Sequence, residues 1–240
     1  MPDIMIALAG GILGMLGDGT ADFFAKKTIH KVGNVITLLY SQIIAAIFLA
    51  LYFIEDSSMP LISAKNLVIL VLLGVIYTFG CLLLYKSFEL GKISVVSPIS
   101  SSYAILAAVV SFLFFGESFS RLKMISLAFI FLGILLLAVD LTDRRTGRRR
   151  IGNLPKGSPQ ALGAFFIFGF YFPIWDQFIE GSGWIVWAIL LKAIVAISLI
   201  VYSQGIKRMS ISVREKPILF LLFTIAFFTA LGSFGTTWAY

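Results

Sequence analysis

Eight apolar runs, each about 20 residues long, constrain this chain more than any other feature of its sequence. A helix rises about 1.5 Å per residue, so a run of this length crosses the roughly 30 Å hydrocarbon core of a bilayer. Backbone groups inside a bilayer must be paired within their own segment, so the runs predict membrane-spanning α-helices. The expected spans are residues 4–25, 35–54, 67–88, 93–115, 122–141, 160–178, 183–202 and 218–240.

The composition also indicates an all-α polytopic membrane protein. Hydrophobic residues make up 59% of the 240 residues and charged residues only 13%, a balance that the surface of a soluble domain does not tolerate. The single cysteine, Cys81, excludes an internal disulfide. The single histidine, His30, leaves no cluster with metal-ligand spacing. We therefore expect no metal and no cofactor.

The net charge of +7 comes mainly from basic residues in the loops between the apolar runs. Loops after the first, third, fifth and seventh runs hold 15 Lys and Arg residues, whereas the other loops hold three. A bias of this kind sets membrane orientation, so the loop at 142–159 is predicted to be cytoplasmic and Met1 external. Because topology explains the basic residues, nucleic acid is not an expected partner.

Two acids in the first run lie where a lipid-facing helix would carry only apolar residues. The row Gly10, Gly14, Asp18, Asp22, Lys26 steps by four residues, so a helix places it on one face. A charge near the centre of a span costs about 2.5–3.5 kcal/mol on insertion scales, so Asp18 should face protein or water. Either Asp18 serves a substrate or a proton, or both acids cap a helix that is broken at its neighbouring glycines. Asp22 can alternatively pair with Lys26.

The sixth and seventh runs contain further unusual residues. Pro173 lies inside the sixth run next to Trp175 and Asp176, and a broken helix beside an acid is a pointer to a transporter's binding site. The alternative is a packing kink with an interfacial end. Lys192 lies near the middle of the seventh run and should point inward, toward an anionic substrate, water or a carboxylate, with Asp18 and Asp176 as the candidate carboxylates.

A constant offset within the sequence indicates an internal repeat. A shift of 154 residues lays Asp22-Phe23-Phe24 over Asp176-Gln177-Phe178, and a shift of 155 lays Phe79-Gly80 over Phe234-Gly235. The prediction is a first five-helix unit at 1–141, a basic loop at 142–159 and an incomplete second unit of three helices at 160–240. An odd number of spans inverts the second copy, and eight transmembrane helices are then present of an expected ten.

The stretch from Tyr85 to Asp140 resembles the closing part of the five-helix unit in EamA-type carriers of the drug/metabolite transporter superfamily. The matching residues are Ser97-Pro98-Ile99, then Gly116-Glu117, and then the Leu/Ile/Gly-rich run to Asp140. The resemblance implies ten helices around a central cavity. It also implies a transport path lined by the first, third and fourth helices and their counterparts. Carried onto this sequence, the path residues are Asp18, Asp22, Tyr77, Tyr85, Pro98, Ser101, Tyr103, Trp175, Asp176 and Trp238.

Lys192 is added to this predicted path because a buried lysine needs a partner, although the seventh helix is not usually central in such carriers. The expected function is secondary-active transport of a small metabolite by alternating access, with an amino-acid-like substrate and efflux as candidates and Asp18 as a proton-linked group. The chain is not expected to be an enzyme.

The alternative function is that of a membrane-embedded enzyme acting on lipid or isoprenoid phosphate. Against it, the sequence offers no acid cluster with metal-binding spacing and no activated nucleophile. A structural membrane protein is a third possibility. The expected partners are a small-molecule substrate, membrane lipid and protons, in the plasma membrane, and a homo-oligomer is left open.

Overall fold

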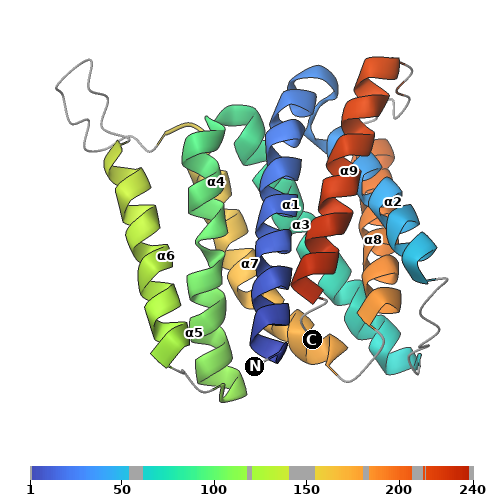
Figure 1. The fold of residues 1–240 in the computed structure, drawn as a ribbon. Helices are drawn as coiled ribbons and strands as arrows, with labels where there is room; N and C mark the ends of the chain where they lie inside the picture. The colour runs from blue at the N-terminus through green and yellow to red at the C-terminus, as the bar shows by residue number, and fades with distance from the viewer. Residues whose placement is uncertain are drawn as a thin grey trace.

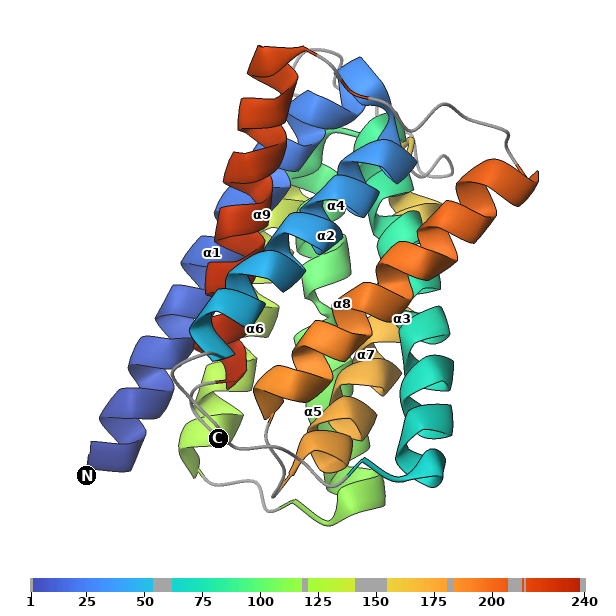
Figure 2. The ribbon, with the colours of Figure 1, turned by 90° about the vertical axis from the view of Figure 1, so that its right-hand side faces the viewer.

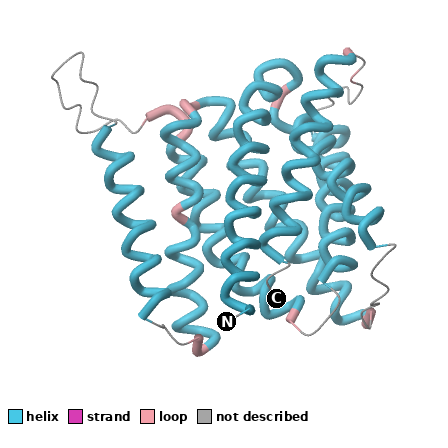
Figure 3. Tube along the Cα trace, viewed as in Figure 1, coloured by secondary structure: helices cyan, strands magenta, loops and turns pink. Residues whose placement is uncertain are grey.

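The computed structural model describes residues 2–53, 62–117, 121–140, 155–180, 184–206, 213 and 215–237. These residues form helices and short connections (Figures 1 and 3). The elements are α1 (Pro2–Val32), α2 (Asn34–Phe53), α3 (Ala64–Leu90), α4 (Ile93–Ser101), α5 (Tyr103–Phe115), α6 (Arg121–Asp140), α7 (Ser158–Ile179), α8 (Trp184–Val201), the π-helical turn η1 (Tyr202–Ile206) and α9 (Lys216–Thr237).

Six segments of the described chain are long and apolar enough to cross a membrane. They are Asn34–Phe53, Ala64–Leu90, Ile93–Phe115, Ser158–Ile179, Trp184–Gly205 and Lys216–Gly235. A multi-pass membrane protein is therefore confirmed. Helices α1 and α6 are not among the six, so the count of eight spans stays a prediction.

The helices form a bundle in which segments far apart in the sequence lie side by side (Figures 1 and 2). Helix α1 packs most extensively on α9, α3 packs on α7, and α2 packs on α8. Helix α2 also contacts α9, while α8 contacts α3. Helices α4 and α5 lie on α7, and α6 makes only small contacts with α4 and α5 at the edge of the bundle (Figure 1).

Glycines bring α1 and α9 into close contact. A Cβ added at Gly17 would lie 2.5 Å from the backbone nitrogen of Gly232, and one at Gly235 would lie 2.6 Å from the backbone nitrogen of Gly14. Small residues at such positions let two membrane helices approach closely. Gly14 and Gly17 of α1 therefore pack closely on Gly235 and Gly232 of α9. Helix α1 continues without interruption through Gly17 and Gly19, so the prediction that the acids cap a broken helix is wrong.

The break occurs in the fourth predicted span instead. Helix α4 ends at Ser101, Ser102 is its C-cap, and α5 begins at Tyr103. Pro98 has no N–H to donate, and the Ser102 hydroxyl donates to the Pro98 carbonyl at 2.7 Å. The sixth predicted span, by contrast, is the single helix α7 through Pro173, so a broken helix at that proline is not observed.

Gly116 closes α5 in the left-handed conformation, with φ of 67°. The sequence Ser158-Pro159 predicts a helix start with the serine as N-cap and the proline in the first turn. Ser158 is the first helical residue and Gly157, with φ of 85°, is the N-cap. A serine cap was therefore the wrong expectation, although Pro159 does lie in the first turn.

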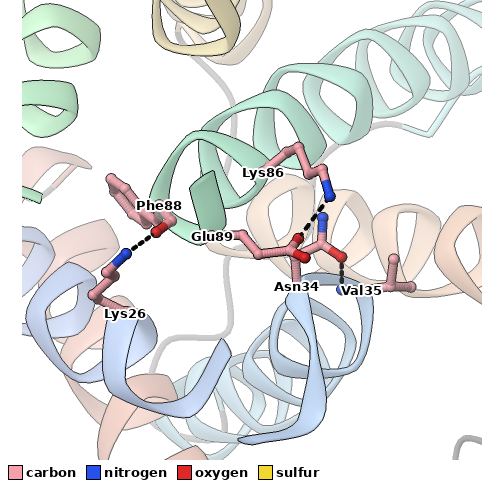
Figure 4. Close-up of polar contacts among 6 residues, drawn as sticks. All are labelled: Lys26, Asn34, Val35, Lys86, Phe88 and Glu89. Atoms are coloured by element: carbon pink, nitrogen blue, oxygen red, sulfur yellow. Dashed lines mark hydrogen bonds and ion pairs between the residues drawn. The ribbon is translucent and has the colours of Figure 1, made fainter. Parts of the chain in front are cut away.

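The end of α1 is tied to the end of α3 by Lys26 (Figure 4). Its ammonium group donates to the carbonyl oxygens of Phe88 and Gly91, the latter at 2.7 Å. An Asp22–Lys26 pair is not formed, because Lys26 reaches the unpaired carbonyls at the C-terminus of α3. Gly91 also packs against the carbonyl of Lys156, so α1 ends where α7 begins and the two helices run in opposite directions.

Two parts of the sequence predictions lie outside the described residues. The basic loop at 142–159 is described only from residue 155, and its cytoplasmic position is not tested. Trp238, predicted to line the path, follows the last described residue of α9.

Candidate functional site

Five helices bring titratable side chains together in the middle of the bundle. We call this set the central cluster, and its members interact electrostatically across helix boundaries. Asp18 interacts with Lys192, Tyr77 and Tyr103, and Asp22 interacts with Asp18, Cys81 and Tyr85. The cluster comprises Asp18 and Asp22 of α1, Tyr77, Cys81 and Tyr85 of α3, Tyr103 of α5, Tyr171 and Asp176 of α7, and Lys192 of α8.

Helix periodicity explains how α3 contributes three members. Tyr77, Cys81 and Tyr85 are spaced by four residues, so their side chains follow one face of the helix. The side chains of Tyr77 and Cys81 lie within hydrogen-bonding reach of each other, and Tyr85 reaches Ser41 of α2. This face of α3 therefore links α2 to α7.

Aromatic rings from α3, α5 and α7 line one side of the cluster. Tyr103 stacks on Phe172 with a centroid distance of 4.8 Å, and Tyr77 contacts Tyr171 at 5.0 Å. Tyr171 in turn stacks on Trp175 at 6.1 Å. Close approach of α5 to α7 makes the Tyr103–Phe172 contact possible, since Gly169 leaves room for Leu106. Such a wall suits the apolar part of an amphipathic molecule, although aromatic rings also serve packing.

Lys192 and Asp18 differ in how far the surrounding helices cover them. Lys192 is 5% exposed and shares the buried face of α8 with Ala188, Val195 and Leu199. Asp18 is exposed, and its carboxyl group lies against Gly232 of α9. The two interact electrostatically but form no ion pair within 4.0 Å. The inward direction predicted for Lys192 is observed, with Asp18 nearby.

Four buried side-chain polar atoms in the described part of the bundle have no hydrogen-bond partner: the hydroxyl oxygens of Tyr171 and Ser158 and the side-chain carbonyl oxygens of Gln42 and Gln160. Tyr171 is 2% exposed and Gln42 is 3% exposed. Unpaired polar groups inside a bundle cost free energy, and they require an explanation. One explanation is a ligand that supplies the missing partner.

The structure brings together most of the residues that the sequence predicted for the path. Seven predicted residues belong to the central cluster, and Trp175 joins it through Tyr171. Pro98 lies outside the cluster, at the break before α5, and Ser101 is exposed beside it.

Sequence reasoning missed Cys81 and Tyr171 as cluster members. Their signal was available, since each lies four residues from another predicted path residue: Cys81 from both Tyr77 and Tyr85, and Tyr171 from Trp175. Among the described residues, no three His, Cys, Asp or Glu side chains come together in the way that a metal ion would need.

Comparison with known proteins agrees with this arrangement. The profile of the EamA-like transporter family matches residues 5–139, more than half of the chain. The uncharacterized protein MJ1333.1 of Methanocaldococcus jannaschii is 28% identical over 134 residues, which cover 56% of this chain and 97% of the relative. The resemblance seen between Tyr85 and Asp140 is thereby confirmed. This multi-pass integral membrane protein belongs to the EamA-like transporter family.

Proposed function

We propose that this protein moves a small amphipathic metabolite across the membrane by secondary-active transport. The observation that carries the proposal is the central cluster, in which acids, an ammonium group and tyrosines from five helices meet. Ionisable residues in membrane helices are costly, and they mark substrate or ion pathways. Because the chain belongs to a transporter family, the most direct interpretation of the cluster is a transport path.

The proposed mechanism is alternating access between two inverted units, residues 1–141 and 160–240. If α7, α8 and α9 are the counterparts of α1, α2 and α3, exchanging the units maps the α1–α9 contact onto α7–α3 and the α2–α9 contact onto α8–α3. The α2–α8 contact maps onto itself. Helices α1 and α7 run in opposite directions, as we expect if the second unit is an inverted copy of the first. The archaeal relative, matched over 97% of its length, supports a unit of this size.

We also propose that one end of the bundle acts as a gate. Lys26 joins α1 to the carbonyl ends of α3, and Gly91 packs on the chain just before α7. The Lys26 contacts lie within the first unit, whereas the Gly91–Lys156 contact joins that unit to the chain that leads into α7. Rocking of one unit against the other would have to break the Gly91–Lys156 contact, so we assign this contact to the state in which this end is closed.

The proposed substrate is amino-acid-like, because the rings of Tyr77, Tyr103 and Trp175 offer an apolar wall next to charged groups. Efflux across the plasma membrane, with the basic loop in the cytoplasm, is the direction and orientation we propose. Both rest on the family resemblance and on the distribution of Lys and Arg along the sequence.

Asp18 is the group that we propose to link transport to protons. It lies in the cluster beside Lys192, and its charge state would affect both the ammonium group and any solute next to it. The enzyme alternative has no comparable support, since family membership favours transport.

Flux measurements in proteoliposomes test this proposal. The full chain is reconstituted, and a panel of labelled amino acids and aromatic acids is followed with and without a pH gradient. We expect the native protein to accelerate at least one compound, and a pH gradient to increase that flux. Asp18→Asn should keep flux but lose its dependence on the gradient, whereas Glu89→Gln, an acid at the bundle end, should keep both. Gradient-dependent flux in Asp18→Asn would refute the proton role, and absence of flux for every compound would refute transport.

A further inference from the structure

Lys192 is the most thoroughly buried charge among the described residues. It lies on the inward face of α8, is 5% exposed, and neighbours Leu191 and Val195 in the hydrophobic core. An ammonium group at this depth cannot reach the membrane surface by extending its side chain, because the buried face points into the bundle. A partner inside the bundle must therefore stabilise its charge.

The described residues provide only part of the stabilisation that the charge of Lys192 requires. The interactions of Lys192 among them are charge interactions with Asp18 and Cys81, and neither is an ion pair within 4.0 Å. An ammonium group carries three hydrogen-bond donors and no acceptor. Among the described residues, no hydrogen bond or ion pair of this ammonium group is observed.

A second unused donor lies close by. The hydroxyl group of Tyr171 is buried without a hydrogen-bond partner, and its ring contacts Tyr77 at 5.0 Å. Tyr77 lies within hydrogen-bonding reach of Cys81, and Cys81 interacts with both Tyr171 and Lys192. Gly74 of α3 packs on Leu191 and Ile194 of α8, about one helical turn from the Tyr77 ring that contacts Tyr171. Lys192 and Tyr171 therefore approach neighbouring turns of α3.

We propose that Lys192 and Tyr171 form a subsite for an oxyanion, a carboxylate or a phosphate, on the transported molecule. An anionic oxygen accepts several hydrogen bonds at once, and charge-assisted bonds of this kind are about twice as strong as neutral ones. The neighbouring rings of Trp175 and Tyr77 would hold an apolar group attached to that anion. The inference rests on the proposed function, because it assigns a part of the solute to residues of the same site.

A different role for Lys192 would be purely internal. The ammonium group could serve as a counter-ion that keeps Asp18 charged, with no contact to a solute. The two roles differ in one consequence. A counter-ion becomes dispensable when Asp18 is also neutralised, whereas an anion subsite does not.

Binding of three matched probes to the purified full chain tests the subsite. The probes are phenylacetate, phenyl phosphate and the uncharged 2-phenylethanol, which share a ring and differ in charge. Affinity is measured by calorimetry in detergent for the native protein, Lys192→Met, Lys192→Arg, Tyr171→Phe and the double variant Asp18→Asn/Lys192→Met. Lys86→Met, in which a partly exposed lysine at the bundle end is removed, is the matched control.

The native protein should bind at least one anionic probe tenfold or more tightly than 2-phenylethanol. Lys192→Met should reduce that ratio to about one, Tyr171→Phe should lower it several-fold, and Lys192→Arg and Lys86→Met should retain a preference. The double variant should remain without preference. Whether phenylacetate or phenyl phosphate binds more tightly identifies the oxyanion.

Three results would overturn the subsite: no preference for either anion in the native protein, an unchanged ratio in Lys192→Met, or a restored ratio in the double variant. If Lys192→Met does not fold, the test rests on Tyr171→Phe and Lys192→Arg. An unchanged ratio of anionic-probe to 2-phenylethanol affinity in Tyr171→Phe would then overturn the proposal. Anion-dependent binding without flux in proteoliposomes would refute transport and leave the subsite intact. Flux in proteoliposomes together with an unchanged anion preference in Lys192→Met would refute the subsite and leave transport intact.

Discussion

Replacing Gly17 by alanine should weaken the contact between α1 and α9, whereas the same change at Gly19 should not. A Cβ at Gly17 would lie 2.5 Å from the nitrogen and 2.8 Å from the Cα of Gly232, and 2.8 Å from the carbonyl oxygen of Phe228. All three atoms belong to the backbone of α9, so relief requires the two helices to separate. At Gly19 no atom lies within 4 Å of the added Cβ.

Comparing Gly17→Ala with Gly19→Ala isolates the free-energy cost of packing a methyl group between α1 and α9. Both variants gain helix propensity, worth about 1 kcal/mol for Gly to Ala, so this gain cancels in the difference between them. Overpacking a well-packed contact costs about 1–3 kcal/mol. We therefore expect Gly17→Ala to be less stable than Gly19→Ala by about 1–3 kcal/mol, with Gly19→Ala as stable as the native protein or slightly more so.

Unfolding in mixed micelles measures this difference. The free energy of unfolding is obtained by titrating dodecyl sulfate and following tryptophan fluorescence and helical circular dichroism. Variants within about 0.5 kcal/mol of each other, or a more stable Gly17→Ala, would refute the close contact between α1 and α9.

Two further predictions concern the end of the bundle where α1 and α3 finish. Lys26→Met removes a charged donor from two backbone carbonyls and should lower the free energy of unfolding by about 1–3 kcal/mol, while the exposed neighbour Lys27→Met should change it little. Equal effects in the same micelle titration would contradict the role of Lys26. Glu89→Gln breaks a partly exposed ion pair with Lys86, and we expect less than about 0.5 kcal/mol; a loss above 1 kcal/mol would show that the pair matters more than its exposure suggests.

The positions of the helices were predictable because the length of each apolar run sets where a membrane-spanning helix can begin and end. The predicted span at 35–54 became α2 (Asn34–Phe53), and the span at 160–178 became α7 (Ser158–Ile179). Helix α1 extends to Val32, about two turns beyond its predicted end, because polar residues such as Lys26 find partners on α3 that a hydropathy pattern does not reveal.

Local breaks were harder to predict. Pro98 and Pro173 give the same signal in the sequence, yet only the first is followed by a break. After Pro98, the hydroxyls of Ser100 and Ser102 donate to nearby carbonyls and compete with the regular ladder. Pro173 is buried within α7, whose neighbouring aromatic side chains pack on adjacent helices.

The charged members of the site were visible in the sequence because a charge inside an apolar run stands out. Asp18, Asp176 and Lys192 were identified for that reason. Cys81 and Tyr171 look like ordinary residues of a buried helix, and only the packing of α3 on α7 and α8 brings Cys81 near both Tyr171 and Lys192. Partner choice between helices depends on tertiary contacts, which one sequence does not specify.

Accessibility of single cysteines tests most directly whether the ionisable residues share an aqueous site inside the bundle. In a Cys81→Ser background, Lys192→Cys and Ile197→Cys lie on the same helix, but Ile197 is 60% exposed on its outer face. A charged methanethiosulfonate reagent reacts with a thiolate, which forms only where water is present. We predict rapid modification at position 192 and little at position 197. The reverse order, or equal rates at both positions, would contradict the account.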